Sequence, residues 1–263
     1  MEGNTLGVKD TFDLTGKTAV VTGGSIGLGA QMAAGLAEAG ANLVIAARKV
    51  ERCVELCAKL EENGIRAIAV ACDVSDPVSC QNLVDITVKE FGTLDILVNN
   101  AGYTWGADAM NYPMDKWQQV LDLNLTGLFQ LSAMAAKVMK EQGRGKIINI
   151  TSVAGTGGCL PEAQNTVAYN ASKAAVITLT KDLACKWARH GIYVNAIGPG
   201  FFPTHMSGGL LEKNQHLVLP RVPLNRLGGD DDLKGAIVFL SSAASDYVTG
   251  QILFVDGGQT AMI

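Results

Sequence analysis

The sequence has no hydrophobic run long enough to cross a membrane. Its least polar long stretch, residues 123–136, is interrupted by Asn124 and Gln130, whereas a membrane-spanning helix needs about 20 predominantly apolar residues. The first residues include Glu2 and Lys9 and contain no apolar run typical of a secretory signal. We therefore expect a cytoplasmic protein that makes no membrane contact.

The sequence also lacks an excess of positive charge. Lys and Arg number 21 against 25 Asp and Glu, which gives a net charge of -4 at pH 7. Binding to a nucleic-acid backbone requires clustered Lys and Arg, and the sequence contains no such cluster. This charge balance argues against a general nucleic-acid-binding protein.

Cysteine spacing typical of a disulfide framework or a zinc site is absent as well. The six cysteines are scattered, and Cys53 and Cys57 stand one helical turn apart. His190, His205 and His216 are not spaced to complete a metal site with them. We expect buried free thiols on one helix face and no bound metal.

Strand-like and helix-like segments alternate along the 263 residues. This alternation predicts βαβ units and therefore a parallel sheet that is covered by helices on both faces. We predict an α/β fold, with one domain over residues 1–263 built on a doubly wound, Rossmann-like sheet of about seven strands. After a lead-in at 1–16, the expected strands are 19–22, 42–47, 65–71, 94–98, 146–151, 192–197 and 252–255, and the expected helices are 30–39, 50–63, 75–92, 115–142, 169–189 and 230–240.

A glycine-rich turn joins the first expected strand to the first expected helix. Gly23, Gly27 and Gly29 lie there, directly after strand-favouring residues. Glycine lets the backbone approach a pyrophosphate closely, and the free N–H groups of a helix N-terminus attract phosphate. The spacing Gly-x-x-x-Gly-x-Gly differs from the commonest dinucleotide fingerprint, so an ordinary strand-to-helix turn is the alternative. We treat the three glycines as a candidate dinucleotide cradle.

Tyr169 and Lys173 stand four residues apart at the start of an expected helix, so their side chains share one face. An ammonium beside a phenol lowers a pKa that begins near ~10, which predicts that Tyr169 acts as a general acid or base. Ser152 follows the fifth strand, where its hydroxyl can donate a hydrogen bond to a substrate oxygen, and Asn124 places an amide inside a long helical pattern. Considered singly, a Tyr–Lys pair is most often surface or core decoration. A cap or turn role for Ser152 and a helix kink at Asn124 are likewise each favoured over catalysis.

Together these motifs resemble the classical short-chain dehydrogenase/reductase family over residues 14–258, most closely members named 3-oxoacyl carrier-protein reductase and gluconate 5-dehydrogenase. The residues that carry the resemblance are the glycine turn 22–29, Asp73, the Asn-Asn-Ala-Gly stretch 99–102, Asn124, Ser152, Tyr169, Lys173, Pro199, Gly200 and Thr204.

The resemblance implies a role for each of the four polar residues. Tyr169 would transfer the proton, Lys173 would lower its pKa and hold the nicotinamide ribose, and Ser152 would orient the carbonyl. Asn124 would support a water relay to Lys173. The implied cofactor-binding residues are Gly23, Ser25, Ile26, Gly27, Leu28, Gly29, Asp73, Val74, Asn100, Ala101, Gly102, Tyr169, Lys173, Pro199, Gly200, Phe202 and Thr204.

Cofactor choice depends on the residues that follow the second strand, about 20 residues past the glycines. A carboxylate there suits the 2′-hydroxyl of NAD, whereas a guanidinium suits the 2′-phosphate of NADP. The sequence has Ala47, Arg48 and Lys49 at this place and no acid. We predict that Arg48 and Lys49 bind the cofactor and that NADP(H) is preferred, with NAD(H) also possible. Ile26 stands where NADP-using members commonly have a basic residue.

Candidate pocket walls are mainly apolar, and core packing is the alternative for each of them. Apolar walls suit an acyl chain better than a polyhydroxy acid, which needs many polar partners. We therefore predict an enzyme that interconverts a ketone and a secondary alcohol on a 3-oxoacyl thioester (acyl-CoA or acyl carrier protein) or a similar apolar carbonyl. The alternatives are a sugar-acid or polyol dehydrogenase and, from another class, a non-catalytic nucleotide-binding subunit. The predicted wall residues are Trp105, Cys159, Leu160, Phe201, Phe202 and Met206.

Several stretches depart from the family pattern or have no clear period. The interval from Ser152 to Tyr169 is longer than is typical of the family, because the stretch 157–165 is lengthened. Residues 103–106 place two aromatics beside the expected pocket. The irregular stretch 204–227 predicts a mobile substrate lid. The resemblance also implies a homotetramer that packs through the long helices.

Overall fold

A seven-stranded, all-parallel sheet forms the centre of the computed structural model, which describes residues 7–162, 164–203 and 215–262. The strand order β3-β2-β1-β4-β5-β6-β7 confirms the predicted doubly wound sheet. Because the order reverses at β1 and β4, a crevice forms at the carboxyl ends of these strands. The strands are β1 (Thr18–Thr22), β2 (Asn42–Ala47), β3 (Ala67–Ala71), β4 (Ile96–Asn99), β5 (Gly145–Ile150), β6 (Ile192–Pro199) and β7 (Ile252–Val255).

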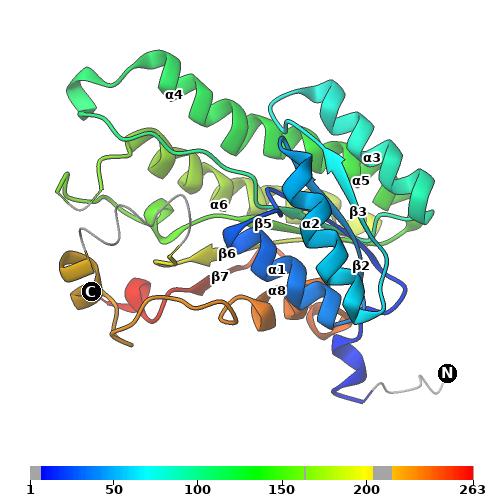
Figure 1. Cartoon of the computed structure of the whole chain (residues 1–263). Coiled ribbons are helices and arrows are strands. Elements are labelled where there is room, and N and C mark those ends of the chain that lie inside the picture. The colour runs from blue at the N-terminus through cyan, green and yellow to red at the C-terminus, as the bar shows by residue number, and fades with distance from the viewer. Residues whose placement is uncertain (1–6, 163, 204–214, 263) are drawn as a thin grey trace.

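Helices cover both faces of this sheet (Figure 1). The principal helices are α1 (Gly27–Glu38), α2 (Val50–Leu60), α3 (Pro77–Phe91), α4 (Met114–Leu121), α5 (Leu128–Gln142), α6 (Val167–Trp187) and α8 (Lys234–Ser241). Helices α1, α2 and α8 pack on one face, and α3, α5 and α6 pack on the other.

Alternation along the strands divides the core into two layers. Val21 and Val98 pack beneath α1 and α8, whereas Val20 and Leu97 pack beneath α3, α5 and α6. Every residue of β1 is buried. Two-sided burial explains why the strands are continuous apolar runs in the sequence.

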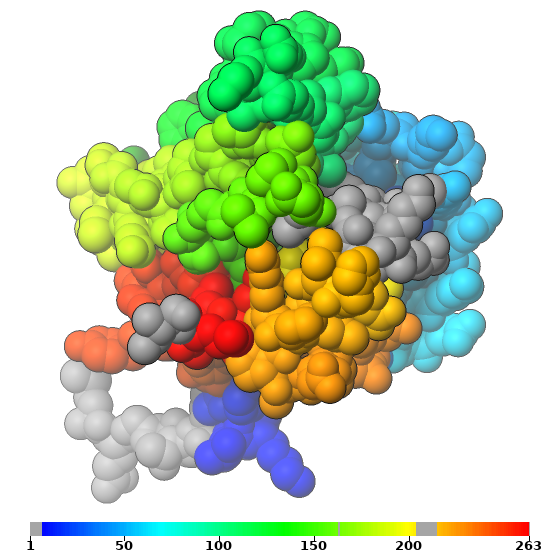
Figure 2. All heavy atoms as spheres, turned by 90° about the vertical axis from the view of Figure 1, so that its left-hand side faces the viewer, coloured from blue at the N-terminus to red at the C-terminus, as the bar shows by residue number. Residues whose placement is uncertain are grey.

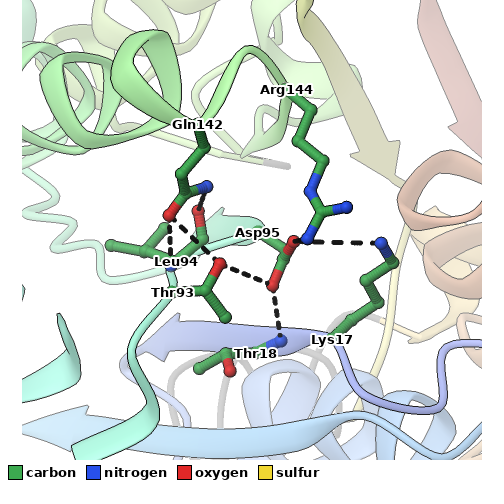
Figure 3. Close-up of polar contacts among 7 residues, drawn as sticks. All are labelled: Lys17, Thr18, Thr93, Leu94, Asp95, Gln142 and Arg144. Atoms are coloured by element: carbon green, nitrogen blue, oxygen red, sulfur yellow. Dashed lines mark hydrogen bonds and ion pairs between the residues drawn. The ribbon is translucent and has the colours of Figure 1, made fainter.

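Strand β4 begins at Ile96, two residues later than predicted. The backbone of Leu94 is hydrogen-bonded to a side chain instead of to a neighbouring strand (Figure 3). Gln142 Oε1 accepts a hydrogen bond from Leu94 N at 2.9 Å, and Gln142 Nε2 donates to Leu94 O at 3.0 Å. The buried Asp95 carboxylate accepts from Thr18 N at 3.1 Å and pairs with Arg144 at 3.2 Å. These contacts fix β4 to β1 and to the end of α5, at the edge of the sheet opposite the crevice.

The predicted long helix over 115–142 is divided by a π-helical segment, Asp122–Gly127, which connects α4 to α5. A Cβ atom at Gly127 would lie 2.3 Å from the carbonyl oxygen of Val74, so this close approach requires glycine. π-Helical turns are frequent at functional sites. Here the turn carries Asn124, whose side chain is completely buried.

Other boundaries also differ from the sequence prediction. The helix predicted over 230–240 begins only at Lys234, because the Asp232 carboxylate accepts hydrogen bonds from Gly229 N and from the Arg226 guanidinium and so closes a turn. The strand predicted from residue 65 begins at Ala67. Of the predicted lid, residues 204–214 lie outside the described residues. None of the described helices is both long and apolar enough to span a membrane.

Candidate active site

A cavity of about 520 Å³ opens at the carboxyl edge of the sheet. Residues that follow β1 to β6 all contribute to its lining, so it extends across most of that edge. Figure 2 looks at the end of the molecule where the green segment after β4 lies above the orange segment that begins at residue 215. Ligands of open α/β sheets bind in crevices at this position.

The glycine turn after β1 leaves the N-terminus of α1 open toward this cavity. Ile26 precedes α1 and, within the described residues, makes no side-chain capping bond, whereas Asp76 caps α3 by accepting from two backbone N–H groups. Gly27 has a φ of +58°, and a Cβ atom on Gly29 would lie 2.4 Å from Gly23 O. The uncapped N–H groups and the lack of a side chain at Gly23, Gly27 and Gly29 suit a pyrophosphate, so the turn fits the dinucleotide cradle that we predicted.

Asn100 braces the turn from the end of β4. Its Nδ2 donates to the carbonyl oxygens of Thr22 at 2.9 Å and Gly23 at 3.0 Å. The neighbouring Asn99 instead donates to Ser132 Oγ at 2.8 Å and Asn149 Oδ1 at 2.9 Å. One asparagine therefore shapes the cradle, and the other stabilises the sheet.

Cations line the cavity after β2. Arg48, Lys49 and Arg52 are among its lining residues. On the β3 side, a hydrogen bond from Ser75 is the main cause of a lowered pKa of Asp73, to which Arg48 also contributes. Arg52 was missed by the sequence analysis, although its spacing of four from Arg48 is a recognisable signal. This end of the cavity can hold an anion, as the 2′-phosphate of NADP requires.

Tyr169 and Ser152 meet at the other end of the cavity. Burial raises the pKa of the half-buried Tyr169 above its ordinary value of 10.0, and a side-chain hydrogen bond with Ser152 partly offsets that rise. The phenol is therefore protonated at neutral pH. This differs from the lowered pKa that the Tyr–Lys spacing predicts.

The position of Lys173 explains the difference. Its Nζ donates a hydrogen bond of 2.7 Å to Ile150 O and lies 5.6 Å from the centroid of the Tyr169 ring. Burial lowers the pKa of Lys173 to about 8. The hydrogen bond of this ammonium goes to the backbone of β5, so the phenol depends on Ser152 and on its own burial.

Asn124 lies behind the wall of the cavity. Its Nδ2 donates to Ser172 Oγ at 3.0 Å, and its amide also contacts the backbone of Tyr103. Ser172 in turn donates to Tyr169 O at 2.7 Å. Asn124 thus joins the π-helical turn to the loop after β4 and to the first turn of α6.

Within the described chain, every predicted catalytic and cofactor-binding residue except Asn124 lines this cavity, and Thr204 lies outside the described residues. Thr104 and Gln164 lie in the two stretches that depart from the family pattern, and that departure is the signal that could have found them. Lining residues that the sequence analysis did not predict include Arg52, Cys72, Thr104, Thr151, Gln164 and Thr166.

The predicted apolar walls are only partly formed. Phe201 and Phe202 line the cavity, but the prediction is wrong for Trp105, Cys159 and Leu160, which do not belong to its described lining. Trp105 is 39% exposed and carries Lys116 Nζ 4.8 Å from its ring centroid, and Leu160 is 62% exposed. Met206 lies outside the described residues.

The doubly wound sheet, the open helix N-terminus and the Tyr–Lys pair beside a strand-end serine define a dinucleotide-dependent oxidoreductase. Comparisons with known proteins agree. A family model described as Enoyl-(Acyl carrier protein) reductase matches residues 23–260. The 2-dehydro-3-deoxy-D-gluconate 5-dehydrogenase of Dickeya dadantii is 40% identical, with 97% of this chain and 99% of that protein covered.

Two further matches support the same conclusion. The 3-oxoacyl-(acyl-carrier-protein) reductase of Synechocystis is 39% identical, with 93% of this chain and 97% of that protein covered. The crystal structure of a gluconate 5-dehydrogenase from Burkholderia cenocepacia, in complex with NADP and tartrate, has a TM-score of 0.92 at 38% identity and covers 98% of this chain and 100% of its own. The chain belongs to the short-chain dehydrogenase/reductase family, and it is an NAD(P)-dependent oxidoreductase that acts on CH–OH groups.

Proposed function

We propose that the substrate is a small hydroxylated molecule of the sugar-acid class, interconverted between ketone and secondary alcohol. The observation that carries this proposal is the polar lining near Tyr169, which comprises Thr104, Gln164 and Thr166. An acyl chain would leave the Thr104 hydroxyl and the Gln164 amide nitrogen without partners, whereas substrate hydroxyls would pair with them. The names of the Dickeya dadantii and Burkholderia cenocepacia relatives support the same substrate class.

A 3-oxoacyl thioester, which the sequence analysis favours, becomes the second candidate. Phe201 and Phe202 line the same cavity and suit an apolar chain. The name of the Synechocystis relative is consistent with that substrate.

The chemistry follows from where each side chain lies. When bound, the nicotinamide supplies or accepts a hydride at the reacting carbon. Tyr169 would donate its proton to the carbonyl oxygen in the reduction, since its raised pKa keeps the phenol protonated at neutral pH. Ser152 would orient the same oxygen through a hydrogen bond. Lys173 would hold the ribose and contribute positive charge below its pKa of about 8.

We further propose that NADP(H) is the preferred cofactor. Arg48, Lys49 and Arg52 would surround the 2′-phosphate, and guanidinium groups bind phosphate through paired hydrogen bonds. The uncapped N-terminus of α1 would hold the pyrophosphate. The Burkholderia cenocepacia relative is in complex with NADP, which supports this choice.

A substrate panel tests the proposed function. The purified chain is assayed with NADPH and, in turn, 5-ketogluconate, an acetoacetyl thioester and an aromatic ketone, and cofactor absorbance gives the rate. We expect the highest kcat/KM with 5-ketogluconate. The highest value with the thioester would instead establish the second candidate.

The homotetramer remains a proposal. Met114 is 69% exposed and Phe129 is 43% exposed along the α4–α5 segment, and apolar side chains of this kind favour packing against another copy. Light scattering coupled to size-exclusion chromatography measures the mass in solution, and a monomeric mass would contradict the proposal.

A further inference from the structure

Two loops that enclose the substrate end of the cavity are fastened to each other. Ala107, in the segment after β4, donates its backbone N–H to the carbonyl oxygen of Asn165, in the segment after β5, at 2.9 Å. Thr104 and Gln164 lie on these two segments, both are half-buried, and both line the cavity with Tyr169. The connection joins the two segments that carry these polar side chains.

The amide of Gln164 is oriented by its own loop. Its backbone N–H donates to Leu160 O at 3.0 Å, and its Oε1 accepts a hydrogen bond from Cys159 Sγ at 3.7 Å. With the carbonyl end of the amide held by the thiol, the Nε2 end is available as a donor. Among the described residues, neither this nitrogen nor the Thr104 hydroxyl has a hydrogen-bond partner, whereas Thr166 donates to Asn170 Oδ1 at 3.0 Å.

Charge is distributed unevenly along the cavity. The lining cations Arg48, Lys49 and Arg52 follow β2, and β1 and β4 separate them from the site after β5. Around Tyr169, Lys173 is the lining cation within the described residues, and its ammonium already donates to Ile150 O. Apart from Lys173, the described substrate end is therefore lined by neutral groups, among which Thr104 and Gln164 can form hydrogen bonds.

We propose that Gln164 and Thr104 determine substrate specificity by hydrogen bonding to hydroxyl oxygens on substrate carbons other than the reacting one. An apolar ketone leaves both side chains without partners, and a site built to pair with hydroxyls discriminates against a molecule that lacks them. The enzyme thus selects hydroxylated ketones over apolar ketones of equal size. This inference rests on the proposed function, because it assigns the substrate hydroxyls to particular side chains.

The test compares two ketones in each of four proteins. The wild type and the variants Gln164→Leu, Thr104→Val and Thr156→Val are assayed with NADPH and either 5-ketogluconate or an aliphatic keto ester of similar size. Thr156→Val is the matched control, because Thr156 lies in the same loop as Gln164, donates to Val153 O and does not line the described cavity. Thermal melting of each protein verifies that it is folded.

For Gln164→Leu and Thr104→Val, we expect kcat/KM for 5-ketogluconate to fall about three- to tenfold, mainly through KM, as the loss of one neutral hydrogen bond predicts. The keto ester should change by less than about twofold, as should both substrates with the control variant. An equal fall for both ketones, or no fall for either, overturns the inference while leaving the proposed function intact. A wild type that reduces the keto ester but not 5-ketogluconate overturns both.

Discussion

The side chain of Asn124 holds both backbone polar groups of Tyr103. Its Oδ1 accepts a hydrogen bond from Tyr103 N at 2.8 Å, and its Nδ2 donates to Tyr103 O at 2.9 Å. The asparagine thereby acts as a strand partner for the loop that carries Thr104 into the cavity. The water relay implied by the family resemblance stays a prediction. The two hydrogen bonds to Tyr103 give Asn124 a structural role in any case.

Replacing Asn124 by Leu should destabilise the protein and reduce activity. The change leaves the Tyr103 N–H and C=O groups unpaired, so we expect the free energy of unfolding to fall by about 2 kcal/mol or more. Urea denaturation measures the fall. Asn124→Asp should also be destabilised, because it keeps the acceptor for Tyr103 N but buries a carboxylate oxygen against Tyr103 O. Unchanged stability in Asn124→Leu would show that these hydrogen bonds to Tyr103 contribute nothing to the free energy of unfolding.

Replacing Tyr169 by Phe should remove the proton donor and preserve the shape of the site. We expect kcat to fall by about a hundredfold or more, because a positioned general acid contributes that much or more to the rate. Fluorescence titration with NADPH should give a Kd close to that of the wild type. Turnover at the wild-type rate would contradict the proposed role of the phenol.

Lys173 should make stability depend on alkaline pH. Burial lowers its pKa in the folded chain from 10.5 to about 8, so between these pH values the unfolded chain binds more protons than the folded chain. The free energy of unfolding therefore increases as the pH rises from about 8 to about 10.5. In this range the buried amine of the folded chain is neutral, while the amine of the unfolded chain still binds a proton. The variant Lys173→Met lacks this titratable amine and therefore serves as the reference.

The stability of Lys173→Met relative to the wild type should accordingly be greatest near neutral pH and decrease through this window. Chemical denaturation of both proteins across the window measures the difference. Subtracting the two curves removes the titration of the other groups. A difference that does not vary with pH would show that Lys173 has an ordinary pKa in the folded chain.

Arg48 and Arg52 should govern the choice between the two nicotinamide cofactors. Replacing either by Ala removes a charged partner of the 2′-phosphate, so we expect Kd for NADPH to rise about tenfold or more while Kd for NADH changes by less than about threefold. Arg66→Ala is a matched control, because Arg66 lies over the Phe91 ring and outside the described cavity lining. Equal losses for NADPH and NADH would place the 2′-phosphate elsewhere.

Gly29 should tolerate no side chain. A Cβ atom there would lie 2.4 Å from Gly23 O and 2.5 Å from Asn100 Nδ2, so Gly29→Ala should lower the free energy of unfolding by about 1–3 kcal/mol and weaken NADPH binding. Gly235 in α8 is the control, since a Cβ atom there meets nothing within 4 Å. Gly235→Ala should raise stability by up to about 1 kcal/mol through helix propensity. Similar behaviour of the two variants would contradict close packing at the cradle.

Much of the fold follows from local patterns in the sequence. The strands at 42–47 and 252–255 have the predicted bounds, because buried parallel strands are short apolar runs between helix-forming segments. The start of β4 was not predictable in this way, because Gln142 pairs with Leu94 from 48 residues away. The π-helical turn likewise depends on the contact between Gly127 and Val74.

The sequence by itself determined the parallel sheet, the glycine turn at its switch point and many of the residues gathered at the carboxyl edge. Each strand in a βαβ chain delivers the residues after it to that edge. Only the tertiary structure decided that the Lys173 ammonium binds the backbone of β5, and that Thr104 and Gln164 line the cavity beside Phe201 and Phe202. These features arise from hydrogen bonds and burial between segments far apart in the chain, which no local periodicity encodes.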